Sequence, residues 1–134
     1  MAQKTFEIRT NSRDEMIDVT DRVAEAVEAS GLSEGVATVY VPHTTAGVTI
    51  NENADPSVVH DVIAALDEAV PWRQGFYRHA EGNSAAHVKS SIVGAAQAVP
   101  FAGGRLTLGT WQAVFFCEFD GPRSRRFRVD VTGR

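Results

Sequence analysis

Three of the four histidines in the sequence stand beside segments that break regular patterns. His43 follows an apolar run, His79 lies in a glycine-containing stretch, and His87 comes eight residues later. Neutral imidazoles that loops bring together are the ligands that zinc and similar divalent metals prefer. No short motif such as His-Glu-x-x-His is present, so a metal site at these three histidines depends on the fold. The fourth, His60, lies in a predicted helix and is expected to be a surface or half-buried residue.

Groups that could hold an anion surround the same histidines. Thr44 and Thr45 offer hydroxyls and backbone amides at a strand end. Gly82 and Asn83 precede a predicted helix, whose first backbone amides are a natural seat for an anion. Lys89 falls in the first turn of that helix, where its charge opposes the helix dipole. A bound anion therefore explains Lys89 better than helix stability does.

Acidic and basic side chains meet near the C-terminus. In a strand over 111–120, alternate residues share a face, so Gln112, Glu118 and Asp120 lie on one side and Cys117 on the other. Four arginines follow within six residues: Arg123, Arg125, Arg126 and Arg128. Either this is a solvated edge with ordinary ion pairs or it is part of a site. Glu52 and Asn53 also have two interpretations. They are either oxygen ligands for magnesium or part of a turn.

Composition and charge exclude several classes of protein. The 134 residues suit one domain, 1–134, and 43% hydrophobic and 22% charged residues are ordinary for a globular chain. The net charge of −4, from 13 basic and 17 acidic residues, argues against nucleic-acid binding through a general basic field. A single cysteine, Cys117, excludes a disulfide framework, and its apolar neighbours predict an inert buried thiol. Without a stretch of roughly 20 apolar residues or a signal core, we expect a cytoplasmic protein with no membrane contact.

The expected elements favour an α+β fold. Asp55 and Pro56 predict a helix start, with a capping carboxylate and proline at the first helical position. Thr20 or Asp21 is expected to cap the preceding helix. Helices are predicted over 21–31, 55–68 and 87–99, and strands over 4–10, 16–20, 35–41, 47–51, 104–111, 111–120 and 125–133. We therefore expect a mixed or mainly antiparallel sheet, sandwich- or half-barrel-like and covered by helices.

Four segments of the chain resemble one known family. They are HTTAGVTINENADP at 43–56, YRHAEGNSAAHVKSS at 77–91, GRLTLGTWQAVFFCEFDGPRSRRFRV at 104–129 and the strand that leads into His43. Together they resemble the YjbQ family, small proteins described as secondary thiamine-phosphate synthases. The resemblance covers nearly the whole chain and implies a compact α+β subunit in a homotrimer, with pockets near subunit contacts. It also implies a weak ability to join hydroxymethylpyrimidine diphosphate and thiazole phosphate, releasing pyrophosphate.

The resemblance and the residue chemistry together assign roles. The family positions that carry over are His43, Thr44, Thr45, Glu52, Asn53, His79, Glu81, Gly82, His87, Lys89, Thr110, Trp111, Gln112, Glu118 and Arg123. The expected catalytic residues are Glu118, Glu52 and Gln112. The expected substrate- and phosphate-binding residues are Thr44, Thr45, Asn53, Gly82, Asn83, Lys89, Arg123 and Arg126. The expected metal ligands are His43, His79 and His87, holding zinc, while magnesium would accompany the pyrophosphate substrate. One departure is Ser84, near a place where many relatives have an aspartate.

These residues are expected to form one pocket. The strands that end in His43–Thr45 and in Asn51–Asn53 would meet at one rim of the sheet, beside the other two ligand histidines. Two other functions remain open. One is a different metal-dependent enzyme acting on a phosphorylated small molecule. The other is a non-enzymatic trimer that binds a metabolite or protein, with Trp72, Phe76 and Tyr77 as interface anchors.

Overall fold

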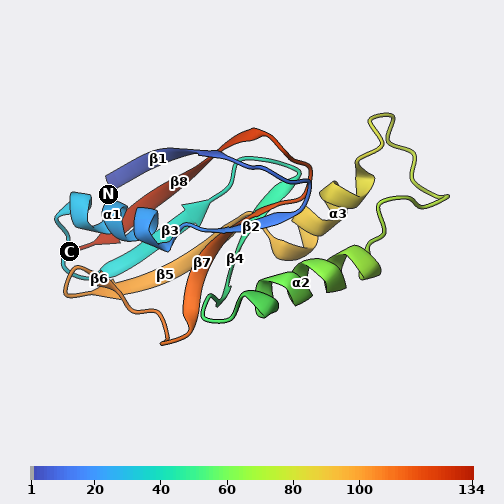
Figure 1. The fold of residues 1–134 in the computed structure, drawn as a ribbon. Helices are drawn as coiled ribbons and strands as arrows, with labels where there is room; N and C mark the ends of the chain where they lie inside the picture. The colour runs from blue at the N-terminus through green and yellow to red at the C-terminus, as the bar shows by residue number, and fades with distance from the viewer. Residues whose placement is uncertain (1) are drawn as a thin grey trace.

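The structure, a computed structural model, describes residues 2–134 (Figure 1). Its strands are β1 (Ala2–Arg9), β2 (Glu15–Asp18), β3 (Gly35–Tyr40), β4 (Ala46–Glu52), β5 (Ala96–Ala102), β6 (Arg105–Leu106), β7 (Gln112–Glu118) and β8 (Ser124–Gly133). Its helices are α1 (Thr20–Ser30), α2 (Pro56–Ala69) and α3 (Ser84–Val93). None of the helices within 2–134 has the length and apolar character needed to cross a membrane.

Within residues 2–134 the strands form two sheets, and neighbouring strands in each run antiparallel. The larger sheet has the order β1-β8-β3-β5-β6 and the smaller one β2-β7-β4. The curled sheets resemble a half-barrel, with α1 at one end and with α2 and α3 together at the other (Figure 1). The predicted α+β class is confirmed, and the sheets are antiparallel throughout the described pairings rather than mixed.

Strand β7 supplies side chains to both hydrophobic cores. Val114 and Phe116 are buried in the cluster that also contains the residues of the larger sheet and α1. Phe115, Cys117 and Phe119 point the other way, into a second cluster with residues of α2 and α3. This alternation confirms the prediction of two distinct faces. Burial of each phenylalanine stabilises the fold by about 1.5–3 kcal/mol, which fixes β7 between the two layers.

Two predicted elements are wrong. The segment expected as one helix over 87–99 is the last part of α3 followed by β5. Gly94 separates them with a φ of 97°, a conformation that glycine adopts without strain. In β5, Val99 and Phe101 are buried and their neighbours are exposed, which is the period of two of a strand. The sequence was predicted as helical because a short apolar run fits either element. The strand expected over 104–111 is reduced to β6.

The two helix starts differ in how well the sequence predicted them. Asp55 caps α2 as expected, accepting a hydrogen bond from the Ser57 amide at 2.9 Å, and the bonds from Ser57 lower the pKa of Asp55. The cap predicted for α1 is wrong. Thr20 is its first helical residue, and the carboxylate of Asp18 accepts from the Thr20 amide at 2.8 Å.

A buried lysine ties α3 to α2 and to the β1–β2 loop. The Lys89 side chain is fully buried, and its ammonium lies 2.9 Å from carboxylate oxygens of both Asp14 and Asp67. Arg13 binds the same two carboxylates at 2.7 and 3.0 Å and lies over the ring of Trp72. The hydrogen bond from Lys89 lowers the pKa of Asp67. This cluster positions the start of the loop that leads to the second predicted ligand histidine.

We predict that Lys89→Met lowers the free energy of unfolding by about 3 kcal/mol. Methionine fills the space but leaves the nearly buried Asp14 with Arg13 as its remaining cation, and breaking a buried pair costs about 3–5 kcal/mol. The low end applies because Asp67 is 45% exposed. Urea denaturation measures the effect. The control is Lys4→Met, whose pair with Glu25 is exposed and contributes less than about 1 kcal/mol. Equal losses in the two variants would contradict the role given to Lys89.

Candidate functional site

The three predicted ligand histidines line one cavity of about 520 Å³. We call it the histidine pocket. Its walls come from the β3–β4 loop, the loop before α3 with the first turns of that helix, and the β7–β8 connection. The lining residues are Pro42, His43, Thr44, Thr45, His79, Glu81, Asn83, His87, Asp120, Arg123 and Arg125. The three histidines and four of the predicted phosphate-binding residues are therefore brought together.

A buried ion pair forms the back of this pocket. The carboxylate of Glu118 accepts from Nε and a terminal nitrogen of Arg125 at 2.9 and 2.5 Å. It also accepts from the hydroxyl of Thr10 at 2.7 Å. Arg125 donates in addition to the hydroxyl of Thr45 at 2.8 Å. Glu118 has no exposed surface and Arg125 only 8%, so the pair joins β7, β8, the end of β1 and the β3–β4 loop in one network.

The network holds Glu118 as an anion. Burial alone would raise the pKa of Glu118, but hydrogen bonds from Arg125, the Asp120 amide and Thr10 outweigh it and lower the pKa. Gly121 makes this packing possible, because a Cβ there would lie 2.8 Å from both Glu118 and Thr10 side-chain atoms. The predicted catalytic Glu118 thus lies behind the pocket wall, where it orients Arg125.

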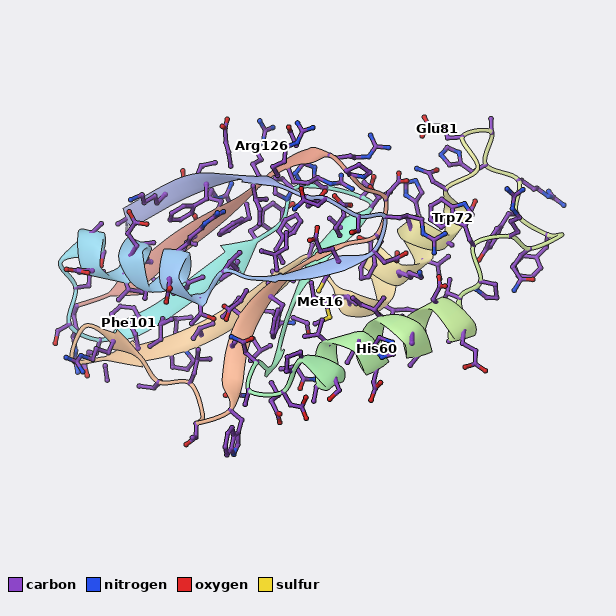
Figure 2. The ribbon with its side chains drawn as sticks, viewed as in Figure 1. Met16, His60, Trp72, Glu81, Phe101 and Arg126 are labelled. Carbon is purple, nitrogen blue, oxygen red and sulfur yellow. The ribbon has the colours of Figure 1, made fainter. Side chains whose placement is uncertain are left out.

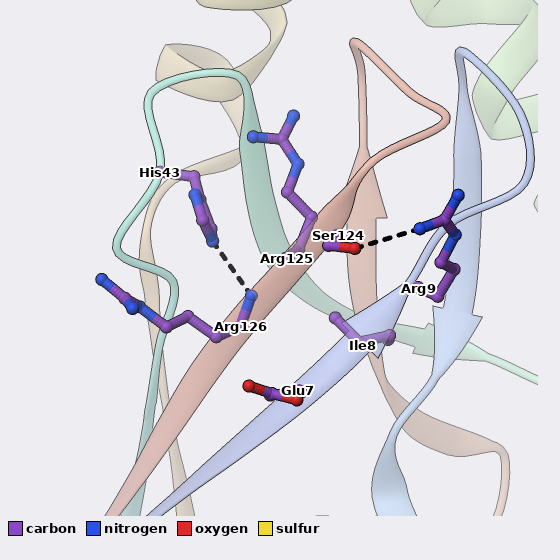
Figure 3. A pocket seen from close by; sticks show the side chains of 7 residues that line it. All are labelled: Glu7, Ile8, Arg9, His43, Ser124, Arg125 and Arg126. Atoms are coloured by element: carbon purple, nitrogen blue, oxygen red, sulfur yellow. Dashed lines mark hydrogen bonds between the residues drawn. The ribbon is translucent and has the colours of Figure 1, made fainter.

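His43 is committed to a hydrogen bond with the backbone. The amide of Arg126 donates to His43 Nε2 at 3.0 Å (Figure 3). Burial lowers the pKa of His43, and the nearby charge of Arg125 lowers it further. The neutral ring therefore carries its hydrogen on Nδ1. Metal ligation through Nδ1 would place a hydrogen on Nε2, facing the Arg126 N–H, so His43 can ligate a metal only by giving up this bond.

His79 and His87 are the better placed pair of metal ligands. Their ring centroids lie 5.2 Å apart, and His79 Nε2 is 3.6 Å from a carboxylate oxygen of Glu81. Two imidazoles and a carboxylate are a donor set that suits zinc. Residues 2–134 nonetheless contain no preformed group of three such ligands at metal-binding spacing. The chemistry of the donors fits a divalent metal in part, and side-chain rotation would have to complete the set.

A polar atom without a partner lies at the helix end of the pocket. The Asn83 amide nitrogen donates to Asp120 at 2.8 Å, and Arg123 donates to the same carboxylate at 3.0 Å. Asn83 is only 6% exposed, and its side-chain oxygen has no hydrogen-bond partner among the described residues. Buried acceptors are normally satisfied. The oxygen is itself buried, so a ligand in the pocket would reach it only after the Asn83 side chain turns toward the cavity.

Four predicted phosphate-binding residues lie outside this cavity: Lys89, Gly82, Arg126 and Asn53, the last of which is described with Glu52 below. Lys89 is buried against Asp14 and Asp67, as described above. Gly82 lines a separate pocket with residues of the loop between α2 and α3. Arg126 lines a neighbouring pocket on the other side of the β3–β4 loop, shown in Figure 3. Of the predicted phosphate ligands, those that line the histidine pocket are Thr44, Thr45, Asn83 and Arg123.

The expectation that Glu52 and Asn53 share this pocket is wrong within one chain. In the antiparallel β4–β7 pair, Ala46 lies opposite Glu118 whereas Glu52 lies opposite Gln112. Six residue steps separate these positions, which is roughly 20 Å along a strand. One polar cluster precedes the start of β4 and the other follows its end. The two clusters therefore lie at opposite ends of the strand.

Asn53 instead belongs to a small polar site at the far end of β4, which Glu52 does not line. Asn53 and Gln112 line a cavity there with Asp18 and Trp111, whose side chain is 64% exposed. The Asn53 amide donates to the Asp18 carboxylate. The side-chain oxygen of Gln112 accepts from the Gly109 amide at 2.9 Å. In this chain the Asn53 side chain links the end of β4 to β2, and the Gln112 side chain closes the turn that precedes β7.

The sequence reasoning missed Asp120 and Arg125 as wall residues, although their place beside Glu118 was visible. Alternation along β7 and β8 would have separated buried Arg125 from exposed Arg126. The other expectations for inert residues are confirmed. Cys117 is buried, which raises its pKa to about 12, and His60 is exposed on α2, away from Glu81 and Arg126 (Figure 2).

We predict that Glu118→Gln lowers the free energy of unfolding by about 3–5 kcal/mol, because it leaves Arg125 buried without a counter-charge. Urea denaturation measures the loss. The double variant Glu118→Leu/Arg125→Met should recover much of it, since neither buried charge remains. A double variant as unstable as the single one would show that the ion pair is not the source of the loss.

The same pair should make stability fall in acid. Because the pKa of Glu118 is lowered by folding, its contribution is present above the ordinary glutamate value of about 4.3 and disappears as pH falls through the lower folded-state value. Stability of Glu118→Gln should therefore depend less on pH below about 4.3. Asp55 and Asp67 have lowered pKa values in both proteins and cancel in the comparison. Parallel pH profiles would refute this origin.

Comparison with known proteins gives a consistent result. A family model described as UPF0047 protein YjbQ-like matches residues 4–134. The chain is 54% identical over 130 residues to UPF0047 protein YugU of Bacillus subtilis, with 97% of this chain and 98% of that protein covered. It is 52% identical over 128 residues to a UPF0047 protein of Methanocaldococcus jannaschii, with 96% and 92% covered. A solved structure of an uncharacterized conserved YjbQ/UPF0047 protein from Clostridium acetobutylicum has a TM-score of 0.94 and 48% identity, covering 96% of this chain and 99% of that one.

Proposed function

Starting from the fact that the chain belongs to the YjbQ-like UPF0047 family, we propose that its histidine pocket is the site of a weak thiamine-phosphate synthase. The reaction joins hydroxymethylpyrimidine diphosphate to thiazole phosphate. The observation that carries the proposal is the convergence of three histidines, two threonines and the start of α3 on one cavity of about 520 Å³. Such a cavity suits a phosphorylated small molecule.

The reaction asks the pocket to stabilise a leaving group and to align two partners. The bond between the pyrimidine methylene carbon and the diphosphate oxygen breaks, and the thiazole nitrogen forms a new bond to that carbon. Pyrophosphate leaves with the electron pair of the broken bond. Stabilisation of its charge and close positioning of the nitrogen are the main sources of rate.

The residues of the pocket supply part of this chemistry. Thr44, Thr45 and Asn83 at the start of α3 line the cavity, and the two hydroxyls and the first amides of the helix would donate to an anion bound there. The unpartnered Asn83 oxygen suits the amino group that the pyrimidine carries. Arg123 and Arg125 are each paired with a carboxylate, so they leave much of the charge of a diphosphate uncompensated.

A divalent metal would supply the missing positive charge and neutralise pyrophosphate when bound. His79, His87 and Glu81 are the residues that would hold zinc, with His43 joining them only if its bond to Arg126 opens. Magnesium could enter with the diphosphate substrate instead. The proposal further includes a homotrimer in the cytoplasm, with small phosphorylated metabolites as its partners.

One observation favours a second candidate, a different metal-dependent enzyme that acts on a phosphorylated small molecule. Of the three predicted catalytic residues, Glu52 and Gln112 lie at the far edge of the sheet, and Glu118 lies behind the pocket wall. In this second candidate the pocket keeps its phosphate chemistry and acts on another substrate. A panel of phosphorylated substrates separates the two functions.

We predict that the purified protein forms thiamine phosphate from the two precursors with magnesium, and that both His79→Ala and metal removal abolish this product. His79→Ala should also lower the content of bound metal, measured by elemental analysis. The matched control is His60→Ala, which removes an exposed imidazole from α2. It should retain both product formation and metal.

The controls show whether the activity belongs to the histidine pocket. Equal product from the native, metal-free and His79→Ala samples would place the activity outside the histidine pocket. Unchanged metal content in His79→Ala would remove this residue from the ligand set. No product from the native protein would contradict the synthase and leave the substrate panel to test the second candidate.

A further inference from the structure

Next to the histidine pocket lies a second cavity of about 590 Å³, formed where β1 pairs with β8 (Figure 3). We call it the Arg9–Arg126 pocket. Arg9 lies opposite Ser124 and Glu7 lies opposite Arg126 in the antiparallel register. Cross-strand partners and alternate residues share a face, so these four side chains project from one side of the sheet. The two arginines are diagonal neighbours with backbones about 7–8 Å apart. Their side chains extend in opposite directions in Figure 3 and would swing toward each other to share one ligand.

Arg9 and Arg126 in this pocket are not neutralised by carboxylates, unlike Arg123 in the histidine pocket. Within residues 2–134, neither Arg9 nor Arg126 forms an ion pair, and Arg9 donates only to the hydroxyl of Ser124, at 3.2 Å. By contrast, Arg123 of the histidine pocket and Arg125, which lines both cavities, are bound to carboxylates. Two free guanidiniums and a hydroxyl form a donor set that matches the oxygens of a phosphate group.

We propose that the Arg9–Arg126 pocket binds a phosphomonoester, as a second anion subsite beside the histidine pocket. Arg9 and Arg126 hold the phosphate from two sides, and the Ser124 hydroxyl donates between them. His43 lines both cavities, and its bond to the Arg126 amide fixes the wall that they share. This inference extends the proposed function and rests on it in one respect: a reaction of a diphosphate with a monophosphate requires two neighbouring anion sites.

Glu7 gives the proposal a second, opposite consequence. Its carboxylate lines the pocket and lies opposite Arg126 in the register, yet no ion pair joins them in the described chain. A carboxylate at this position repels a phosphate. Removal of its charge should therefore strengthen phosphate binding, whereas removal of either arginine should weaken it.

The test uses inorganic phosphate and the full chain. Backbone amide NMR signals of Ser124 and Arg126 are followed during titration, and a saturable shift gives the dissociation constant. Arg9→Gln and Arg126→Gln should each weaken binding about tenfold, as expected for loss of a hydrogen bond to a charged group. Glu7→Gln should tighten it. The matched control is Arg105→Gln, which removes the charge of an exposed arginine in a different cavity and should bind as the native protein does.

Three results would overturn the subsite: no saturable shift in the native protein, native affinity in both Arg9→Gln and Arg126→Gln, or an equal loss in Arg105→Gln. These measurements need no turnover. If no thiamine phosphate forms but phosphate binds with the predicted dependence on Arg9, Arg126 and Glu7, the synthase is contradicted and the subsite stands. If product forms but phosphate binding does not change in the Arg9, Arg126 and Glu7 variants, the subsite is contradicted and the synthase stands.

Discussion

The ion pair between Glu118 and Arg125 is the interaction on which the site depends. It is buried and joins the small sheet to the large one, and through Thr45 it fixes the loop that carries His43. Placing Arg125 inward also sets the backbone of β8 so that the next amide reaches the His43 ring. A buried pair stabilises little compared with an apolar contact. Its value here is geometric, since it determines where two cavities meet.

The distribution of positive charge follows from this arrangement. Lys89, Arg123 and Arg125, which are buried or adjacent to the histidine pocket, are each matched by carboxylates. Arg9 and Arg126 lie on the outer face of the same strands and keep their charge available. One pocket therefore offers imidazoles, hydroxyls and an unpartnered amide oxygen, and the other offers guanidiniums. Two phosphorylated partners with different charge would find different environments on either side of His43.

Much of the fold could be predicted because the relevant signals are local. The period of two in β7 and the Asp55–Pro56 helix start are carried by adjacent residues and hold in the structure. The segment over 87–99 failed because an apolar run with one interior glycine fits a helix and a helix–strand junction equally well. The site was predictable where consecutive residues of one loop line it, as His43–Thr45 do. Glu52 failed because spacing does not reveal that two polar clusters terminate opposite ends of one antiparallel strand.

The most direct test of the histidine pocket is a titration with pyrophosphate that follows the imidazole signals of all four histidines by ¹H–¹⁵N NMR. His60 is a built-in control, since it is exposed on α2 and lines none of the pockets described. The account predicts saturable shifts of His43, His79 and His87 with a common midpoint while His60 stays still. Equal shifts at all four histidines, or movement of His60 alone, would contradict a phosphate-binding site in this pocket.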